Sequence, residues 1–254
     1  MGLKRIIRKR LRASGYEKVD PKAYNQDGLR SVHDHSFMND PRFQAAYARG
    51  VQAATDYAWH WRVHVGLWAA ESAAQLQGDF VECGVNRGFL SSAIMQYLDW
   101  DKLGRSFYLL DTFAGMDERY MGDSDAEKEK ALEKNKKRLE TGFYVSTVDS
   151  VVANFSQWKN VRIVQGAVPD TLARVDSTRI AYLHLDMNCA PPEIAAAEFF
   201  WPRLAPGAFV LLDDYAYGNN REQKEAMDHF AGSRGVPVLS LPTGQGLFIK
   251  PAAT

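Results

Sequence analysis

Residues 79–111 read DFVECGVNRGFLSSAIMQYLDWDKLGRSFYLLD, and this stretch decides the fold. The apolar run 80–83 enters a turn that contains Gly84 and Gly88, and a segment with apolar residues at helical spacing follows. This pattern predicts a strand, a glycine-rich turn and a helix that begins near Gly88. Glycines allow the backbone to approach a ligand closely, and the free N–H groups of a helix start attract polar groups. We therefore expect a polar ligand at this turn.

The next strand and the glycine spacing indicate which ligand. The apolar run 107–110 ends on Asp111, whose carboxylate is expected to face the ribose hydroxyls of a nucleoside. A dinucleotide-binding turn reads G-x-G-x-x-G, but Asn86 and Phe89 occupy the second and third glycine positions. The pattern is instead E-x-G-x-x-x-G, starting at Glu82. This spacing disfavours NAD.

Composition excludes several classes of protein. The 254 residues are 46% hydrophobic, which suits one α/β domain with additions. Lys plus Arg equals Asp plus Glu at 31 each, so nucleic acid is not the expected partner. The sequence has two cysteines far apart, no recognisable signal region and no apolar run of about 18 residues. These features favour a cytoplasmic protein without a membrane-spanning helix.

The segment before the first strand divides at about position 40. Residues 1–12, MGLKRIIRKRLR, could touch an anionic membrane surface, but three aliphatic side chains bury little area, so a solvated tail is favoured for this segment. Residues 1–40 together are expected to form a basic tail and a polar lead-in. Residues 41–78 predict two aromatic-rich helices that provide an interface for a homo-oligomer. His60 and His64 share a helix face, but Trp61 replaces the glutamate of a zinc-peptidase motif, which favours two packed histidines.

Alternating strands and helices continue to the end of the chain. This order predicts a doubly wound, Rossmann-like parallel sheet over 79–254, closed by an antiparallel hairpin. A charged insertion at about 117–140 predicts an exposed helix and, because it follows a strand end, overhangs the ligand crevice. The remaining predicted helices and strands are 148–158, 160–164, 170–174, 180–185, 193–204, 208–212, 222–231, 237–241 and 246–250.

Carboxylates follow two of these strands. Asp186 ends the strand 180–185, and Asp213 with Asp214 ends the strand 208–212, so all three are expected at one sheet edge. Carboxylates brought together repel each other unless a cation intervenes, and an all-oxygen ligand set suits Mg²⁺. The alternative is ordinary turn chemistry, in which Asp213 caps a turn and Asp186 pairs with a base such as Arg203.

Six motifs together carry a resemblance to a known family. In chain order they are ECGVNRG (82–88), LLDTFAG (109–115), VRIVQGAVPDTL (161–172), LHLDMN (183–188), WPRLAPGAFVLLDDY (201–215) and LPTGQGLFIK (241–250). Over about residues 75–251 the chain resembles the macrocin and mycinamicin O-methyltransferases. That family has the class I methyltransferase sheet and methylates sugar hydroxyls of natural products with S-adenosylmethionine and Mg²⁺.

The resemblance implies roles for individual residues. Asp186, Asp213 and Asp214 would bind Mg²⁺, and Asp186 would also be the catalytic base. The cofactor-binding set would be Glu82, Gly84, Val85, Asn86, Gly88, Ser91, Asp111, Thr112, Phe113, Gly166, Ala167 and Asp186. Many relatives carry a second aspartate where this chain has Asn188, and this departure leaves the acceptor open.

The expected function is therefore Mg²⁺-assisted O-methylation of a sugar or glycosylated natural product. Two alternatives remain: a metal-independent methyltransferase acting on another small-molecule nucleophile, and a cofactor-binding scaffold without catalysis. The retained aspartates count against both.

Overall fold

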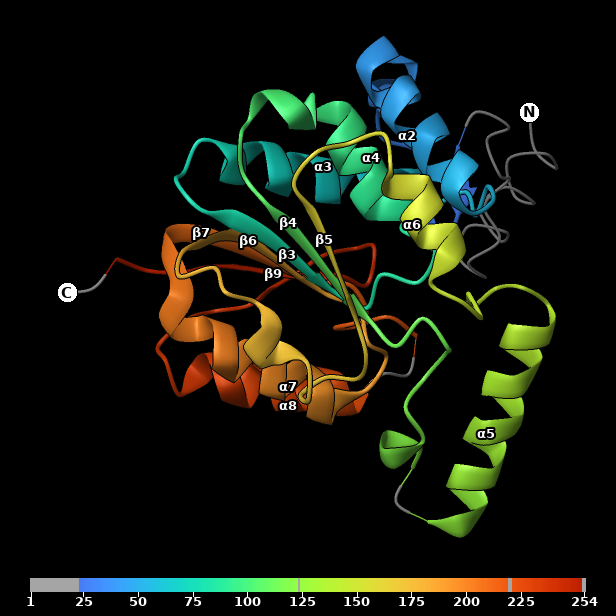
Figure 1. The fold of residues 1–254 in the computed structure, drawn as a ribbon. Coiled ribbons are helices and arrows are strands. Elements are labelled where there is room, and N and C mark those ends of the chain that lie inside the picture. The colour runs from blue at the N-terminus through green and yellow to red at the C-terminus, as the bar shows by residue number, and fades with distance from the viewer. Residues whose placement is uncertain (1–22, 123, 219–220, 253–254) are drawn as a thin grey trace, which may run out of the picture.

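The computed structural model describes residues 23–122, 124–218 and 221–252. Its centre is a seven-stranded sheet with the order β5-β4-β3-β6-β7-β9-β8 (Figure 1). The first five strands in that order are parallel, and β9 runs antiparallel between β7 and β8. The strands are β3 Asp79–Cys83, β4 Phe107–Asp111, β5 Val161–Gln165, β6 Ile180–Leu185, β7 Leu204–Leu212, β8 Leu239–Ser240 and β9 Gly246–Ile249. The predicted doubly wound sheet with a terminal hairpin is confirmed.

Helices cover both faces of the sheet because successive strand residues point to opposite sides. Phe80 belongs to the core under one helical layer, and its neighbour Val81 belongs to the core under the other. Helices α2, α3, α4 and α6 lie over one face, and α7 with α8 lie over the other (Figure 1). The helices are α2 Pro41–Ala53, α3 His60–Ala74, α4 Phe89–Tyr97, α5 Asp125–Glu140, α6 Asp149–Phe155, α7 Ala190–Phe200 and α8 Arg221–Gly232.

Short 3₁₀ helices lie at two of the predicted segments. The helix predicted to run to Leu204 ends at Phe200, because Pro202 cannot continue it and Leu204 already begins β7. The predicted turn 170–174 contains η4. The 3₁₀ segments are η1 Ser36–Asn39, η2 Trp100–Lys102, η3 Glu118–Tyr120, η4 Leu172–Arg174 and η5 Trp201–Arg203.

The N-terminal part of the described chain packs on α4. A hairpin of β1 Tyr24–Gln26 and β2 Leu29–Ser31, which the sequence analysis did not predict, precedes α2. His60 stacks on Tyr47 with ring centroids 4.3 Å apart, and His64 stacks on Phe37 at 4.0 Å. The two histidines are therefore packed among aromatic rings, as their sequence context indicated.

Two of the sequence predictions concern membranes. The basic segment 1–12, for which a membrane contact was considered, lies outside the described residues. Among the described helices, none is long and apolar enough to cross a membrane.

Helix α5 stands apart from the layered body (Figure 1). It begins with a capping box in which Ser124 and Glu127 satisfy each other's backbone N–H groups. Near its other end, Asn135 accepts a hydrogen bond from the Met116 backbone N–H at 3.0 Å. This contact ties α5 to the loop that follows β4, so the predicted charged insertion is an exposed helix attached at the carboxyl edge of the sheet.

Candidate active site

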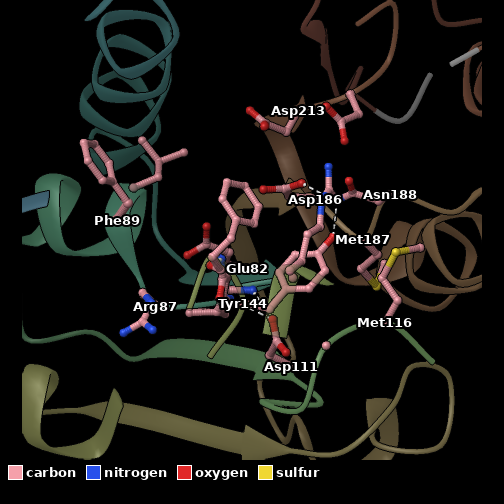
Figure 2. A pocket seen from close by; sticks show the side chains of 18 of the residues that line it. Glu82, Arg87, Phe89, Asp111, Met116, Tyr144, Asp186, Met187, Asn188 and Asp213 are labelled. Carbon is pink, nitrogen blue, oxygen red and sulfur yellow. Dashed lines mark hydrogen bonds between the residues drawn. The ribbon is translucent and has the colours of Figure 1, made fainter. Parts of the chain in front are cut away.

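A cavity of about 650 Å³ opens at the carboxyl ends of β3, β4, β6 and β7 (Figure 2). This is where the fold class places its ligands. The wall is completed by α3, by α5 and by the segment 143–145 that follows α5. The cavity therefore joins the two stretches that the sequence analysis selected: the glycine-rich turn and the aspartates after β6 and β7.

The glycine-rich turn after β3 has no room for side chains at its key positions. Gly84 has φ of +91°, and a Cβ there would lie 1.9 Å from the backbone oxygen of Asp186. Gly88 has φ of +81° and begins α4, and a Cβ there would lie 2.5 Å from the Phe155 ring. Glycine is required at both positions by conformation and by contact.

Asn86 fixes the cavity wall opposite the turn. Its side-chain amide donates to the Phe143 backbone oxygen at 2.9 Å and accepts from the Val145 N–H at 2.9 Å. Tyr144, between these two residues, lines the cavity and lies between Asp111 and Asp186 in Figure 2. The turn and the segment after α5 are therefore joined through one side chain.

The Asp111 carboxylate supports the turn from below. It accepts hydrogen bonds from the backbone N–H groups of Val85, Asn86 and Phe113, each at 2.7 Å. Burial raises the pKa of Asp111 despite these bonds. Asp111 lines the cavity as expected, but most of its hydrogen-bonding capacity is used by the backbone rather than directed toward a ribose.

The structure divides the twelve predicted cofactor residues into two groups. Those that line the cavity are Glu82, Gly84, Val85, Asn86, Asp111, Thr112 and Asp186. Those outside the cavity lining are Gly88, Ser91, Phe113, Gly166 and Ala167. The side chains of Ser91 and Phe113 are fully buried in the fold, so direct side-chain contact with a ligand in the cavity does not fit this arrangement. Val168, just after the Gly166–Ala167 pair, does reach the cavity.

The three aspartates all line the cavity, but they have different partners. Asp186 accepts a hydrogen bond from the Asn188 amide at 3.2 Å. Asp213 is held between the Arg62 guanidinium at 2.5 Å and the Gln245 amide at 2.9 Å. Across the described part of the chain, no three His, Cys, Asp or Glu side chains are grouped so that they could hold a metal ion. The trio predicted as metal ligands is therefore near but not gathered around one point.

Arg62 is a functional candidate that the sequence analysis missed. It projects from α3, is 5% exposed, and also contacts Asp27 of the N-terminal hairpin at 3.2 Å and Asp214 at 4.0 Å. The sequence offered one clue: in the aromatic-rich stretch HWRVHVGLWA, residues 60–69, Arg62 is the only Lys, Arg, Asp or Glu. A lone charge on a buried helix face requires a buried partner.

His184 is a second cation that the prediction did not use. It lies on β6 with Nδ1 2.9 Å from Glu82 Oε1 and Nε2 3.7 Å from Asp213 Oδ1, the latter too long for a hydrogen bond. Burial alone would lower the pKa of His184, but the charges of Asp213 and Glu82 raise it to about 10. The imidazolium form therefore links the strands β3, β6 and β7 beneath the cavity.

The three carboxylates differ in proton affinity. Burial together with the charges of Asp213 and Asp214 raises the pKa of Asp186 well above its ordinary value. Burial and Asp213 raise the pKa of Asp214 to about 6. Burial acts in the same direction on Asp213, but Arg62 and His184 hold its pKa well below the usual range. Asp213 therefore favours the ionised form, whereas Asp186 favours the protonated form unless a cation lies beside it.

The alternative pairing of Asp186 with Arg203 does not occur. Arg203 donates instead to the Phe199 backbone oxygen at 2.6 Å and stacks over the Phe199 ring at 3.9 Å. Asp186 is therefore free of a direct basic partner among the described residues.

Sequence comparisons match this chain to one family model and to two relatives with named activities. The family model described as Macrocin-O-methyltransferase (TylF) matches residues 67–239. The chain is 30% identical over 186 residues to the 8-demethyl-8-(2,3-dimethoxy-alpha-L-rhamnosyl)-tetracenomycin-C 4'-O-methyltransferase of Streptomyces olivaceus, covering 69% of this chain and 67% of the relative. It is 28% identical over 153 residues to the mycinamicin III 3''-O-methyltransferase of Micromonospora griseorubida, covering 57% and 58%.

Solved structures show the same fold. The O-methyltransferase NovP superposes with a TM-score of 0.62 at 21% identity, covering 75% of this chain and 80% of NovP. The calicheamicin methyltransferase CalS11 superposes with a TM-score of 0.52 at 16% identity, covering 91% of this chain and 99% of CalS11.

Proposed function

The chain belongs to the macrocin O-methyltransferase family, and from this premise we propose that it transfers the methyl group of S-adenosylmethionine to a hydroxyl of a sugar or glycosylated small molecule. One observation carries the proposal: the glycine-rich turn and the buried aspartates line a single cavity. A cofactor at the turn and a hydroxyl at the aspartates would then lie within reach of each other, and positioning of this kind supplies much of the rate.

The cofactor would be held by the turn from Glu82 to Asn86. Its backbone is fixed by Asp111 from one side and by the contacts of Asn86 with 143–145 from the other. Thr112 lines the same end of the cavity. A preformed turn of this kind binds its ligand without the cost of ordering a loop.

A divalent cation fits part of the aspartate set. Burial, followed by like charges, raises the pKa values of the Asp186 and Asp214 carboxyls, and a cation would relieve that repulsion. Mg²⁺ is often bound by one or two carboxylates together with water and substrate oxygens. We therefore assign Asp186 and Asp214 to Mg²⁺, which when bound would lower the pKa of the acceptor hydroxyl. Asp213 already has Arg62 as its cation.

Residues of this chain can take the proton that the acceptor hydroxyl loses. Asp186 lines the cavity, and we assign it the role of general base. A cation beside Asp186 would offset the burial and the like charges that raise its pKa, and would keep the carboxylate ionised and able to accept that proton. Arg62 and His184 keep Asp213 ionised, and Asp213 in turn holds both cations beneath the reaction centre. The loop carrying Asn188 would orient Asp186 through their hydrogen bond.

A metal-independent methyl transfer is the second candidate, and the Arg62–Asp213 pair favours it. A buried guanidinium beside the carboxylates supplies positive charge without a metal. Chelation separates the two candidates, because only the metal-assisted reaction would lose activity in EDTA and regain it with Mg²⁺.

The test is methyl transfer from labelled S-adenosylmethionine to a panel of rhamnosides and other glycosides. We expect the label on a sugar oxygen, and we expect Asp186→Asn to lower turnover at least about 100-fold while binding of S-adenosylhomocysteine stays unchanged. Label on nitrogen or carbon, or full activity of Asp186→Asn, would contradict the proposal.

A further inference from the structure

Two basic side chains of α5 face the cavity. Lys134 and Arg138 are four residues apart, which places them on one face of the helix, and both line the cavity. Helix α5 otherwise stands away from the layered body (Figure 1). The α5 wall of the cavity therefore carries positive charge.

Neither side chain has an acidic partner within the described parts of the chain. Lys134 makes no hydrogen bond and no ion pair there. Arg138 donates only to the Tyr144 hydroxyl, and its guanidinium lies 5.1 Å from the ring centroids of Phe143 and Tyr144. Elsewhere on the same helix, Lys136 does pair with Glu140, at 3.9 Å. The two cations of α5 that face the cavity therefore lack the kind of partner that Lys136 has.

Keeping these two charges together is unfavourable in the free protein. Like charges four residues apart destabilise a helix by roughly 0.2–0.5 kcal/mol. The charge of Arg138, followed by burial, lowers the pKa of Lys134, which shows the same crowding. An anion between the two side chains would remove this cost, and aromatic packing already holds the Arg138 guanidinium in position for one.

Two other kinds of anion could neutralise Lys134 and Arg138, the aspartates of the site and the carboxylate of the cofactor, but both fit less well. Asp213 and Asp214 form no ion pair with Lys134 or Arg138 in the described parts of the chain, and Asp213 is already paired with Arg62. Asp214 attracts both α5 cations only over a longer distance. The cofactor's carboxylate is better served by Arg87, which belongs to the glycine-rich turn, lines the cavity and is anchored through its Nε to the Gly142 oxygen at 2.9 Å. The remaining anion is a group on the acceptor.

We propose that the acceptor is a sugar that carries a phosphate or diphosphate, with the phosphate bound by Lys134 and Arg138 and a sugar hydroxyl at Asp186. Arg138 presents several N–H donors in a fixed plane, and Lys134 adds a mobile charge, a combination that suits phosphate oxygens. This inference rests on the proposed function and narrows its substrate class from glycosides in general to glycosyl phosphates.

The experiment is titration calorimetry of the full chain saturated with S-adenosylhomocysteine and Mg²⁺. The probes share one sugar: thymidine diphosphate rhamnose, rhamnose 1-phosphate and methyl rhamnoside. We expect both phosphorylated probes to bind at least about tenfold more tightly than methyl rhamnoside, with an affinity that falls as salt is raised. A further gain for the diphosphate probe would identify a nucleotide sugar, and equal binding of the two would identify a simple sugar phosphate.

Substitutions on α5 test whether Lys134 provides the tighter binding of the phosphorylated probes. Lys134→Ala should weaken binding of the phosphorylated probes about tenfold, and Lys134→Arg should restore most of it. Lys137→Ala removes the same charge from an exposed position outside the cavity and should leave binding unchanged.

Three results would overturn the inference. They are equal affinity for methyl rhamnoside and the phosphorylated probes, wild-type affinity for those probes in Lys134→Ala, and weaker binding of S-adenosylhomocysteine in Lys134→Ala, which would assign the cation to the cofactor. Failure of the wild-type chain to bind S-adenosylhomocysteine would instead overturn the proposed function.

Discussion

The guanidinium of Arg62 lies 2.5 Å from the carboxylate of Asp213, and both side chains are almost completely buried. The pair connects α3, which belongs to the N-terminal helices, to the end of β7 at the cavity floor. Asp27 and Tyr217 extend the contact, because Asp27 binds Arg62 at 3.2 Å and accepts from the Tyr217 hydroxyl at 3.0 Å. The N-terminal hairpin is thereby tied to the loop after β7.

Removal of the Arg62 side chain should strongly destabilise the protein. Arg62→Ala leaves Asp213 and Asp27 without their shared cation in a buried site, and breaking one side of a buried pair costs about 3–5 kcal/mol. Urea unfolding measures the loss. The control is Lys102→Ala, which breaks the similarly short but exposed pair with Asp99, at 2.6 Å, and should change stability little. Equal effects of the two substitutions would contradict the role given to Arg62.

Gly84→Ala should prevent stable folding or shift the turn. The added Cβ would overlap the Asp186 backbone oxygen at 1.9 Å, in addition to the strain of positive φ. Gly104→Ala separates the steric overlap from the backbone strain. Gly104 also has positive φ, but a Cβ added there would meet nothing within 4 Å. We expect Gly104→Ala to cost about 1 kcal/mol, measured by thermal unfolding, and Gly84→Ala to cost several times more. Similar melting temperatures for the two variants would show that the turn is not tightly packed.

Asp111→Asn should weaken cofactor binding about tenfold or more. The amide offers one acceptor oxygen where the carboxylate now receives three backbone N–H groups through two oxygens, so the turn loses its support. Titration with S-adenosylhomocysteine measures the change. Asp101→Asn is the matched control, since Asp101 accepts one backbone N–H, from Lys159, at an exposed position in η2. An unchanged affinity of Asp111→Asn for S-adenosylhomocysteine would show that Asp111 does not support cofactor binding.

Stability should depend on pH through His184. Its pKa is about 10 in the folded state against an ordinary value of 6.5, so the folded state binds the proton more tightly. The stabilisation is complete below about pH 6.5 and is lost as the pH rises toward 10. The difference in unfolding free energy between wild type and His184→Gln should therefore shrink from pH 6 to pH 10. A constant or growing difference would mean that His184 is neutral in the fold.

The sequence predicted the sheet well because its strands are buried runs between clear turn residues. The 79–111 stretch folds as expected, with Gly88 at the start of α4 and Asp111 at the end of β4. The apolar runs of β6 and β7 likewise end just before Asp186 and Asp213. Local patterns of this kind depend on residues close in the chain, so they can be read without knowing the tertiary structure.

The partners of the site residues were not predictable in the same way. Arg62 and Asp213 are 151 positions apart, and no local pattern indicates that α3 reaches the end of β7. The metal prediction for Asp213 assumed that no protein cation lay beside it. The two α5 cations, Lys134 and Arg138, were treated as part of an exposed charged face, because spacing along a helix does not show which face meets a cavity.

The most direct test of the central claim is calorimetric titration of the purified chain with S-adenosylhomocysteine and, separately, with NAD, each with and without Mg²⁺. We expect saturable binding of S-adenosylhomocysteine at one site per chain and no binding of NAD. Binding of NAD instead, or of neither compound, would contradict the assignment of the glycine-rich turn and the proposals that depend on it.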